Sequence, residues 1–320
     1  MEPQYYTVNN FKFESEFVLP HLKIEYHAFG KKEVNEEGNL TNGIIYLHGM
    51  SGDYTSIKRI KDIIGPGKPI DTEKYYIICP TALGSPGSSA PSTSGLGNFF
   101  SHYTIKDMVN AIHAFLSECF NVKHLKGIIG TSMGGFQALE WAVSYPEFMD
   151  FVIPITTSHD VRGKNFAIFN LMNTFIKNDP DYKDGEYEQN PEIGPQNATM
   201  LLYLYGFSDR FYKKSSDEEV LESLEEMKKE GMKTDANDIV WRNEAAMSHD
   251  ISKRVENIKS KVLIIGINED QYFPPDLDTI PLSKMIRGSE LLLYDSELGH
   301  LGTSEIKKVE NVISKFLEGI

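Results

Sequence analysis

A pentapeptide around Ser132 has the residue types and spacing of a catalytic serine. It reads G-T-S-M-G from Gly130 to Gly134, which is a G-x-S-x-G pattern. The apolar run 125–129 precedes it and the helix-forming run 136–142 follows it, so the pattern predicts a strand, a sharp turn and a helix. Glycine is expected on both flanks because a Cβ there would collide with the neighbouring strand or helix. The serine hydroxyl would then be held out toward a substrate.

A serine hydroxyl reacts only when a base takes its proton, and the base in turn needs an acid that orients it. With this type of turn, the acid and then the histidine follow the serine along the chain. Asp270 follows the apolar run 261–266, and His300 follows the run 290–294. Each is expected just beyond the carboxyl end of a strand, where open α/β sheets place their ligands. We therefore predict that Ser132, Asp270 and His300 form a catalytic triad.

Other residues compete for the roles of acid and base. Glu269, Asp276 and Asp278 are rivals of Asp270, although Glu269 would point differently from the same loop. His300 could be a solvent-exposed loop histidine, but the glycines close to it favour a loop shaped around its side chain. No group of His, Cys, Asp or Glu has metal-ligand spacing and H-E-x-x-H does not occur, so no metal is expected.

Acyl transfer to a serine passes through a tetrahedral oxyanion, which backbone N–H groups stabilise. One donor is expected from Met133, directly after the serine. The second is expected from the loop that follows the apolar strand 43–47 and begins at His48, with Met50 as the donor. An ordinary glycine turn is the alternative interpretation of this loop.

Several stretches resemble the homoserine O-acetyltransferases of the α/β-hydrolase superfamily. They are the segments 65–72, 104–109, 130–142 and 270–275. The resemblance implies an α/β-hydrolase fold: a mostly parallel central sheet flanked by helices, with an inserted helical lid. Carried over by position, it implies Ser132, Asp270 and His300 as the triad and Met50 and Met133 at the oxyanion hole. It also implies an acetyl-enzyme and ping-pong exchange with acetyl-CoA, which would be a co-substrate and not a bound cofactor.

Two positions depart from the family pattern. The family's catalytic histidine is followed by an aspartate that meets the amino group of homoserine, whereas Leu301 follows His300 here. The family arginine that holds the substrate carboxylate aligns with Thr199. The glycine-rich segment 83–91 is also altered. Losing two charged contacts should weaken recognition strongly, so the residues support acyl-transfer chemistry better than homoserine as the acceptor.

Three functions follow from these residues. The first is an acyltransferase that uses acetyl-CoA or a related thioester as its small-molecule donor. The second is an esterase or thioesterase, in which water releases the acyl group from Ser132. The third is a catalytically silent binding protein, which is disfavoured because all three triad residue types occur in the expected order.

The charge of the chain restricts its partners. Its 320 residues carry a formal net charge of −14, which argues against binding nucleic acid or an anionic membrane. The same charge opposes a phosphate-rich molecule such as CoA unless basic residues cluster locally. Such a cluster consists of Lys58, Arg59, Lys61 and Lys68. A solvated helix face explains these four residues equally well.

The elements that must position these residues can be placed along the chain. The segment 17–29 is expected to form opening antiparallel strands, and 43–155 alternates strands and helices as a parallel sheet requires. The segment 158–250 lacks this alternation, so we predict a helical lid there between the sixth and seventh strands. Residues 1–157 and 251–320 would then form the catalytic core.

Smaller signals complete the expected organisation. Ser216 and Glu219 form a capping-box pattern at the start of one lid helix, and 84–97 is expected to be a long loop at the rim of the pocket. The apolar run 200–207 is expected to pack in the core, to cover the acyl pocket or to join two subunits in a homodimer. Two cysteines and an amino terminus without a signal-peptide pattern predict a cytoplasmic protein, and no apolar run is long enough to span a bilayer.

Overall fold

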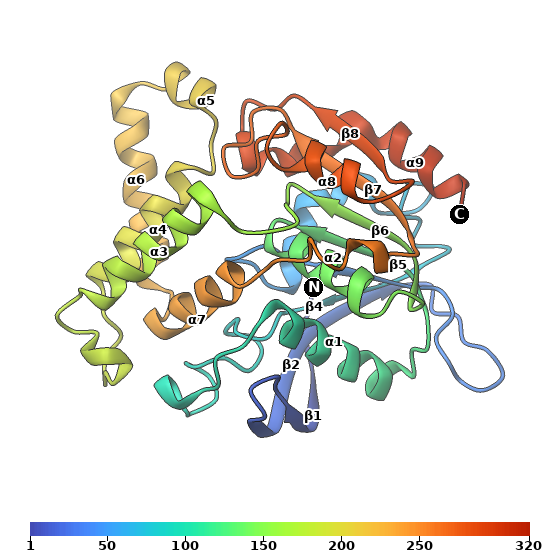
Figure 1. Cartoon of the computed structure of the whole chain (residues 1–320), viewed down its shortest axis with the longest axis horizontal. Coiled ribbons are helices and arrows are strands. Elements are labelled where there is room, and N and C mark those ends of the chain that lie inside the picture. Colours follow the sequence, from blue (N-terminus) through green and yellow to red (C-terminus); the bar gives the residue numbers. More distant parts are fainter.

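Eight strands form one sheet in the computed structural model, which describes residues 1–320 (Figure 1). The strands are β1 (Gln4–Lys12), β2 (Val18–Gly30), β3 (Gly43–Leu47), β4 (Tyr76–Pro80), β5 (Leu125–Thr131), β6 (Met149–Ile155), β7 (Lys261–Ile267) and β8 (Glu290–Tyr294). Their order in the sheet is β1-β2-β4-β3-β5-β6-β7-β8. The pairs β1–β2 and β2–β4 are antiparallel and all other pairs are parallel, which confirms the predicted mostly parallel sheet.

The antiparallel start of the sheet differs from the sequence-based expectation. Segment 17–29 was expected to contain more than one strand, but nearly all of it forms the single strand β2, which pairs with β1. Pro20 lies inside β2. The strand continues past it because the position opposite, Asn10, is simply left out of the ladder, as expected for a residue without an N–H donor.

Helices cover both faces of the sheet. On one face, α1 (Ile105–Phe120) and α2 (Met133–Ser144) contribute to a large buried apolar cluster. On the other face lie the 3-10 helices η1 (Tyr54–Ile63) and η5 (Gly299–Val309) with α9 (Glu310–Glu318), and their buried side chains form a second cluster. The helix α8 (Thr279–Met285) packs beside β7 and β8. Short 3-10 turns at Gly97–Phe99, Lys183–Gly185 and Val255–Asn257 complete these connections.

Five helices follow β6 and stand to one side of the sheet in Figure 1. They are α3 (Gly163–Lys177), α4 (Ile193–Leu204), α5 (Asp209–Lys214), α6 (Asp217–Met232) and α7 (Ala236–Met247). Helix α4 packs on α3 and α6, and α3 packs on α7. A bridge between Asp160 and Asp250 ties the two ends of this segment together. No helix of the chain has both the length and the apolar character that a membrane crossing requires.

Two local expectations have clear outcomes. The capping box of α6 is confirmed, because the Ser216 hydroxyl accepts the Glu219 N–H and the Glu219 carboxylate accepts the Ser216 N–H. The loop 84–97 is long, as expected, but does not line the pocket around Ser132. It instead packs on β2 through the Ser88 hydroxyl and on α7 through Ser92, because its small polar side chains satisfy buried backbone and carboxylate groups there.

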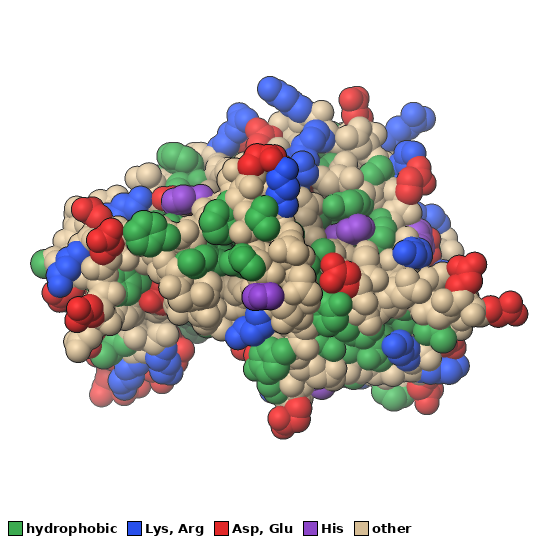
Figure 2. All heavy atoms as spheres, turned by 90° about the horizontal axis from the view of Figure 1, so that it is seen from below, with side chains coloured by type: hydrophobic (Ala, Val, Ile, Leu, Met, Phe, Trp, Pro, Cys, Tyr) green, Lys and Arg blue, Asp and Glu red, His purple; other side chains and the backbone are tan.

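The acidic excess of the chain is not gathered into one patch on the face shown in Figure 2. Acidic and basic side chains are interspersed there, with small groups of hydrophobic side chains between them. This distribution favours solubility without creating a strong field of one sign on that face.

Candidate active site

Ser132 lies at the sharp turn between β5 and α2. Its backbone has φ 55° and ψ −119°, a conformation that L-residues rarely adopt. An added Cβ at Gly130 would lie 2.0 Å from the Gly134 carbonyl oxygen, and one at Gly134 would lie 2.0 Å from the Leu47 carbonyl oxygen. Both flanking positions therefore require glycine for the steric reason inferred from the sequence.

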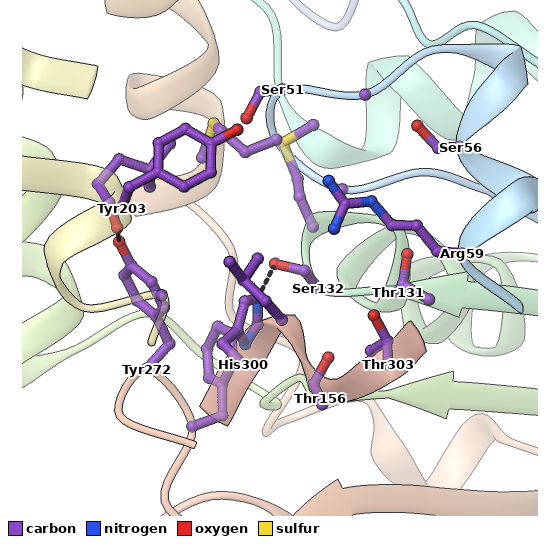
Figure 3. A pocket seen from close by; sticks show the side chains of 18 of the residues that line it. Ser51, Ser56, Arg59, Thr131, Ser132, Thr156, Tyr203, Tyr272, His300 and Thr303 are labelled. Carbon is purple, nitrogen blue, oxygen red and sulfur yellow. Dashed lines mark hydrogen bonds between the residues drawn. The ribbon is translucent and has the colours of Figure 1, made fainter. Parts of the chain in front are cut away.

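The structure brings the three predicted triad side chains together. Ser132 Oγ lies 2.9 Å from His300 Nε2, the contact drawn as a dashed line in Figure 3. His300 Nδ1 lies 2.8 Å from Asp270 Oδ2. The Asp270 side chain is fully buried and 12% of the His300 side chain is exposed. The imidazole can therefore accept the serine proton on one nitrogen while its other N–H donates to the carboxylate.

Asp270 is the candidate acid that contacts His300. Its Oδ1 accepts the N–H groups of Tyr272 and Phe273 at 2.8 and 3.1 Å. Glu269, from the same loop, accepts the N–H of Ser296 instead.

The two remaining candidate acids lie away from the imidazole. Asp276 is exposed. Burial raises the pKa of Asp278 to about 6, and the Ser158 hydroxyl, with which Asp278 is hydrogen bonded, opposes that rise. The one carboxylate within 4.0 Å of the His300 ring nitrogens is that of Asp270, so neither Asp276 nor Asp278 is its ion-pair partner.

Two backbone N–H groups near Ser132 are available for an oxyanion. Met133 is the first residue of α2, so its N–H has no acceptor within the helix. Met50 lies in the loop after β3, and its N–H makes no backbone hydrogen bond. This loop passes close to Ser132, because an added Cβ at Gly49 would lie 3.4 Å from Ser132 Cβ.

His48 holds that loop in place. Its Nδ1 donates to the Gly49 carbonyl at 2.8 Å and its Nε2 accepts the Ala82 N–H at 2.9 Å. Burial lowers the pKa of His48 to about 4, so the ring is neutral at pH 7. A neutral ring with one donor and one acceptor fits both contacts. Sequence reasoning assigned His48 to the loop but did not identify this anchoring role.

A cavity of about 100 Å³ opens at Ser132. One wall carries polar side chains that include Arg59, Thr131 and Thr303, and Figure 3 shows the Arg59 guanidinium directed into the cavity. Nine of the 20 lining residues are hydrophobic, and Leu301 is one of them. Leu202, Tyr203 and Gly206 from the run 200–207 also line the cavity. Of the four basic residues noted in the sequence, Arg59 alone lines the cavity, whereas the other three are exposed lysines.

A second cavity of about 110 Å³ adjoins the first and shares Met50, Ser51, Leu202 and Tyr203 with it. Thr199 lines this second cavity, and so does Arg242 of α7. Sequence reasoning missed Arg242, since a single arginine in a helical segment gives no signal of its own. No group of three or more His, Cys, Asp or Glu side chains is arranged to hold a metal ion.

Comparison with known proteins defines the class to which this fold and site belong. Residues 43–296 match the family described as alpha/beta hydrolase fold. A probable acyltransferase of Methanothermobacter thermautotrophicus is 44% identical over 98% of this chain and 97% of its own. A homoserine O-acetyltransferase of Trichormus variabilis is 30% identical over 91% of this chain and 86% of its own. The solved structure of the acetyl esterase MekB superposes with a TM-score of 0.89 at 25% identity, covering 99% of this chain and 97% of MekB.

The chain belongs to the α/β-hydrolase fold family. Within that family it is a homoserine O-acetyltransferase-like enzyme, an acyltransferase or an esterase.

Proposed function

We propose that the chain transfers a small acyl group through an acyl-enzyme on Ser132. His300 is the general base, Asp270 orients its imidazole, and the N–H groups of Met50 and Met133 form the oxyanion hole. The observation that carries this proposal is the continuous line of hydrogen bonds from Ser132 Oγ through His300 to Asp270, at 2.9 and 2.8 Å.

The chemistry proceeds in two balanced halves. In the first, Ser132 Oγ attacks the acyl carbonyl of a thioester or ester while its proton passes to His300 Nε2. The oxyanion collapses to an acyl-serine ester, and the leaving thiolate or alkoxide takes the proton from His300. In the second half, an acceptor hydroxyl gives its proton to His300 and attacks the acyl-serine. The acyl group is thereby transferred to the acceptor oxygen, and His300 returns the proton to Ser132 Oγ.

Acetyl-CoA or a related thioester is the donor that the relatives support. Their names include a probable acyltransferase and homoserine O-acetyltransferases. We propose an acceptor other than homoserine, because Leu301 lines the first cavity and Thr199 lines the second. Both positions carry charged contacts in the family pattern, and neither carries a charge here.

Hydrolysis by water on the same triad is the second candidate function. The uncharged Leu301 beside the site favours it, since no acid holds an amino-group acceptor there. The likeness to the acetyl esterase MekB also supports it. In this alternative, water replaces the acceptor hydroxyl in the second half-reaction.

We also propose that residues 158–250 act as a lid over a core of residues 1–157 and 251–320. Leu202 and Tyr203 support this role, because they line the cavity above Ser132. Large apolar side chains of the lid remain exposed and support a homodimer formed through it: Phe166, Leu171, Ile193, Leu204, Leu221 and Met232.

Mass spectrometry of the intact protein tests the proposed function. The protein is incubated with acetyl-CoA or p-nitrophenyl acetate, quenched and digested. We expect one acetyl group on the peptide that contains Ser132, and none in the Ser132→Ala variant, which should fold normally. Turnover of either donor at an unchanged rate by Ser132→Ala would rule the proposal out. Release of free acetate or of an acetylated acceptor then separates hydrolysis from transfer.

A further inference from the structure

Arg242 is a buried cation with little to neutralise it. Only 4% of its surface is exposed. Its Nη1 donates to the Met50 carbonyl at 3.0 Å, which is the one hydrogen bond of the guanidinium, and its Nε is buried without a partner. No carboxylate forms an ion pair with it within 4.0 Å, whereas the half-buried Arg254 pairs with Glu140.

Two acids that could neutralise Arg242 form hydrogen bonds or an ion pair with other groups. Asp238 lies one turn earlier on α7, and the charge of Arg242 opposes the rise that burial causes in the pKa of its carboxyl. Its two oxygens accept the N–H and the hydroxyl of Ser92 at 3.0 and 2.6 Å and do not bond the guanidinium. Glu230 lines the same cavity but is exposed and pairs with Lys233 at 2.6 Å. An arginine stays charged at any physiological pH, and a buried charge without a partner is costly. The arrangement therefore suits an anion that enters the cavity.

The position of this cavity connects it to the chemistry. It lies between the oxyanion loop and helices α4 and α7, and it shares four lining residues with the cavity at Ser132. A small molecule can therefore place an anionic end near Arg242 and a hydroxyl or an acyl carbonyl near Ser132. Amino acids fit this space poorly, because Leu301 provides no acid for an ammonium group and Glu230 already has its lysine.

We propose that the second cavity binds a substrate carboxylate, with Arg242 as its cation, and that the substrate carries no ammonium group. The guanidinium has free N–H donors that can bind a carboxylate, and such charge-assisted hydrogen bonds are the strong ones. The carboxylate belongs either to a short hydroxy acid that accepts the acyl group or to the acyl chain of a dicarboxylic half-ester. This assignment of substrate rests on the proposed acyl-enzyme, whereas binding of the anion does not.

Thermal unfolding tests the binding step without turnover. Wild-type protein is heated with butyrate or with butyramide, at matched ionic strength. We expect butyrate to raise the unfolding temperature and butyramide to leave it unchanged, because a ligand of the folded state stabilises it. The Arg242→Met variant should lose the butyrate shift. The matched control Arg287→Met removes an exposed arginine that lines neither cavity and should keep it. An equal butyrate shift in Arg242→Met, or no shift in wild type, would overturn the proposal.

Partition kinetics identify the source of the carboxylate. For the acceptor, the acetyl-enzyme from p-nitrophenyl acetate is offered 4-hydroxybutyrate, 1-butanol or homoserine. For the donor, acylation by p-nitrophenyl hemiglutarate is compared with acylation by p-nitrophenyl valerate. In one of these two comparisons the carboxylate compound should react about tenfold faster than its neutral counterpart. A ratio of this size corresponds to the free energy of one charge-assisted hydrogen bond. In the acceptor arm, 4-hydroxybutyrate should also exceed homoserine.

The readout is the rate with the carboxylate compound divided by the rate with its neutral counterpart. A general loss of activity lowers both rates and leaves this ratio unchanged. Arg242→Met should bring the ratio close to one, and Arg242→Lys, which keeps the charge but loses the planar fork, should keep part of it. Arg287→Met should keep the full ratio. A wild-type ratio near one in both arms, or a ratio that survives in Arg242→Met, would refute the carboxylate site. Absence of any acyl group on Ser132 would refute the proposed function, while the butyrate shift would still report on the site.

Discussion

Each of the three proposed triad side chains is held by groups outside the triad. The left-handed backbone of Ser132 projects its hydroxyl from the turn, and two N–H groups fix the Asp270 carboxylate. The His300 ring packs against the rings of Tyr272 and Phe273, with centroids 5.1 and 5.6 Å away. The hydrogen-bonded line is therefore formed before substrate binds, which is the preorganisation that such catalysis requires.

Replacing Asp270 by Asn should leave the fold intact and remove most of the activity. The amide oxygen can still accept the N–H groups of Tyr272 and Phe273, so the loop has no reason to move. His300 would lose the carboxylate that sets its tautomer and stabilises its charged form. By analogy with the equivalent change in serine proteases, kcat should fall on the order of 10⁴-fold.

Steady-state hydrolysis of p-nitrophenyl acetate measures this effect. Circular dichroism checks that the variant is folded, and Glu269→Gln, which alters the neighbouring acid, is the matched comparison. A fall in kcat of less than about tenfold in Asp270→Asn, or a larger fall in Glu269→Gln, would transfer the orienting role to another group.

The convergence of the three candidate side chains was predictable from the sequence, whereas the burial of Arg242 was not. The order of Ser132, Asp270 and His300 was readable because each follows a strand of the sheet and loops at that edge converge. Choosing between Asp270 and Glu269 needed the loop geometry, since the two are adjacent and both are acids. Arg242 could not be identified from the sequence, because what distinguishes it is its burial and its unbonded Nε, which only the packing of α7 reveals.

At the scale of elements, one ion pair ties α2 to the segment that returns from the lid. Arg254 donates to both oxygens of Glu140, each at 2.7 Å. The Glu140 side chain is 3% exposed and that of Arg254 is 38% exposed. Helix α2, which begins directly after Ser132, is thus anchored where the chain re-enters the core.

Replacing Arg254 by Met should destabilise the protein strongly. It would leave the buried Glu140 carboxylate without its cation, and breaking a buried pair from one side costs about 3–5 kcal/mol. Because Arg254 is partly exposed, we expect the lower end of that range. Urea unfolding measures the change in the free energy of unfolding.

A double variant tests whether the charges of Arg254 and Glu140 act as a pair. Arg254→Met combined with Glu140→Gln removes both charges and should recover part of the loss, since no buried charge remains. A double variant whose destabilisation equals the sum of the two single changes would show that the pair does not act as a unit.

Elements were predictable where their pattern was strong. The parallel strands were readable because a strand buried on both faces is a continuous apolar run, and the capping box of α6 is a purely local signal. The segment 17–29 was misjudged because the antiparallel partner of β2 is β1, which lies before this segment in the chain and not within it. The contacts of the loop 84–97 depend on β2 and α7, which are distant in sequence.

At the scale of the whole molecule, the two cavities lie where the core meets the inserted helices. The loop after β3, which we propose forms part of the oxyanion hole, comes from the core and Arg242 comes from α7, and the contact between them joins the two parts. Movement of α7 would therefore change the oxyanion loop and the second cavity together. Neither part contains a complete site by itself.

Two buried histidines make the stability of the whole chain sensitive to acid. Burial lowers the pKa of His48 to about 4 and that of His249 to about 3, from an ordinary value of 6.5. Above about pH 6.5 both rings are neutral in the folded and unfolded states, and their contribution is complete. As the pH falls below that value, the unfolded chain takes up protons that the folded state refuses, so stability decreases. Each histidine contributes at most about 1.4 kcal/mol per pH unit.

Urea unfolding between about pH 7.5 and 5.5 measures this dependence. The His249→Phe variant should show a shallower loss, because the new ring can keep the stack on Phe136, whose centroid lies 4.5 Å from that of His249. The exposed His21 is the matched control, and His21→Gln should leave the dependence unchanged. An identical pH dependence in wild type and His249→Phe would contradict this assignment.

Labelling by a phosphonofluoridate tests most directly whether residues 132, 270 and 300 work as one unit. The serine oxygen attacks phosphorus, fluoride leaves, and the proton passes to the histidine, so the reaction requires the same activated hydroxyl as acyl transfer. We predict one phosphonyl group per chain, on the peptide that contains Ser132, and labelling about a thousandfold slower in the His300→Ala variant. Labelling at another residue, or at an unchanged rate in His300→Ala, would contradict the proposed active site.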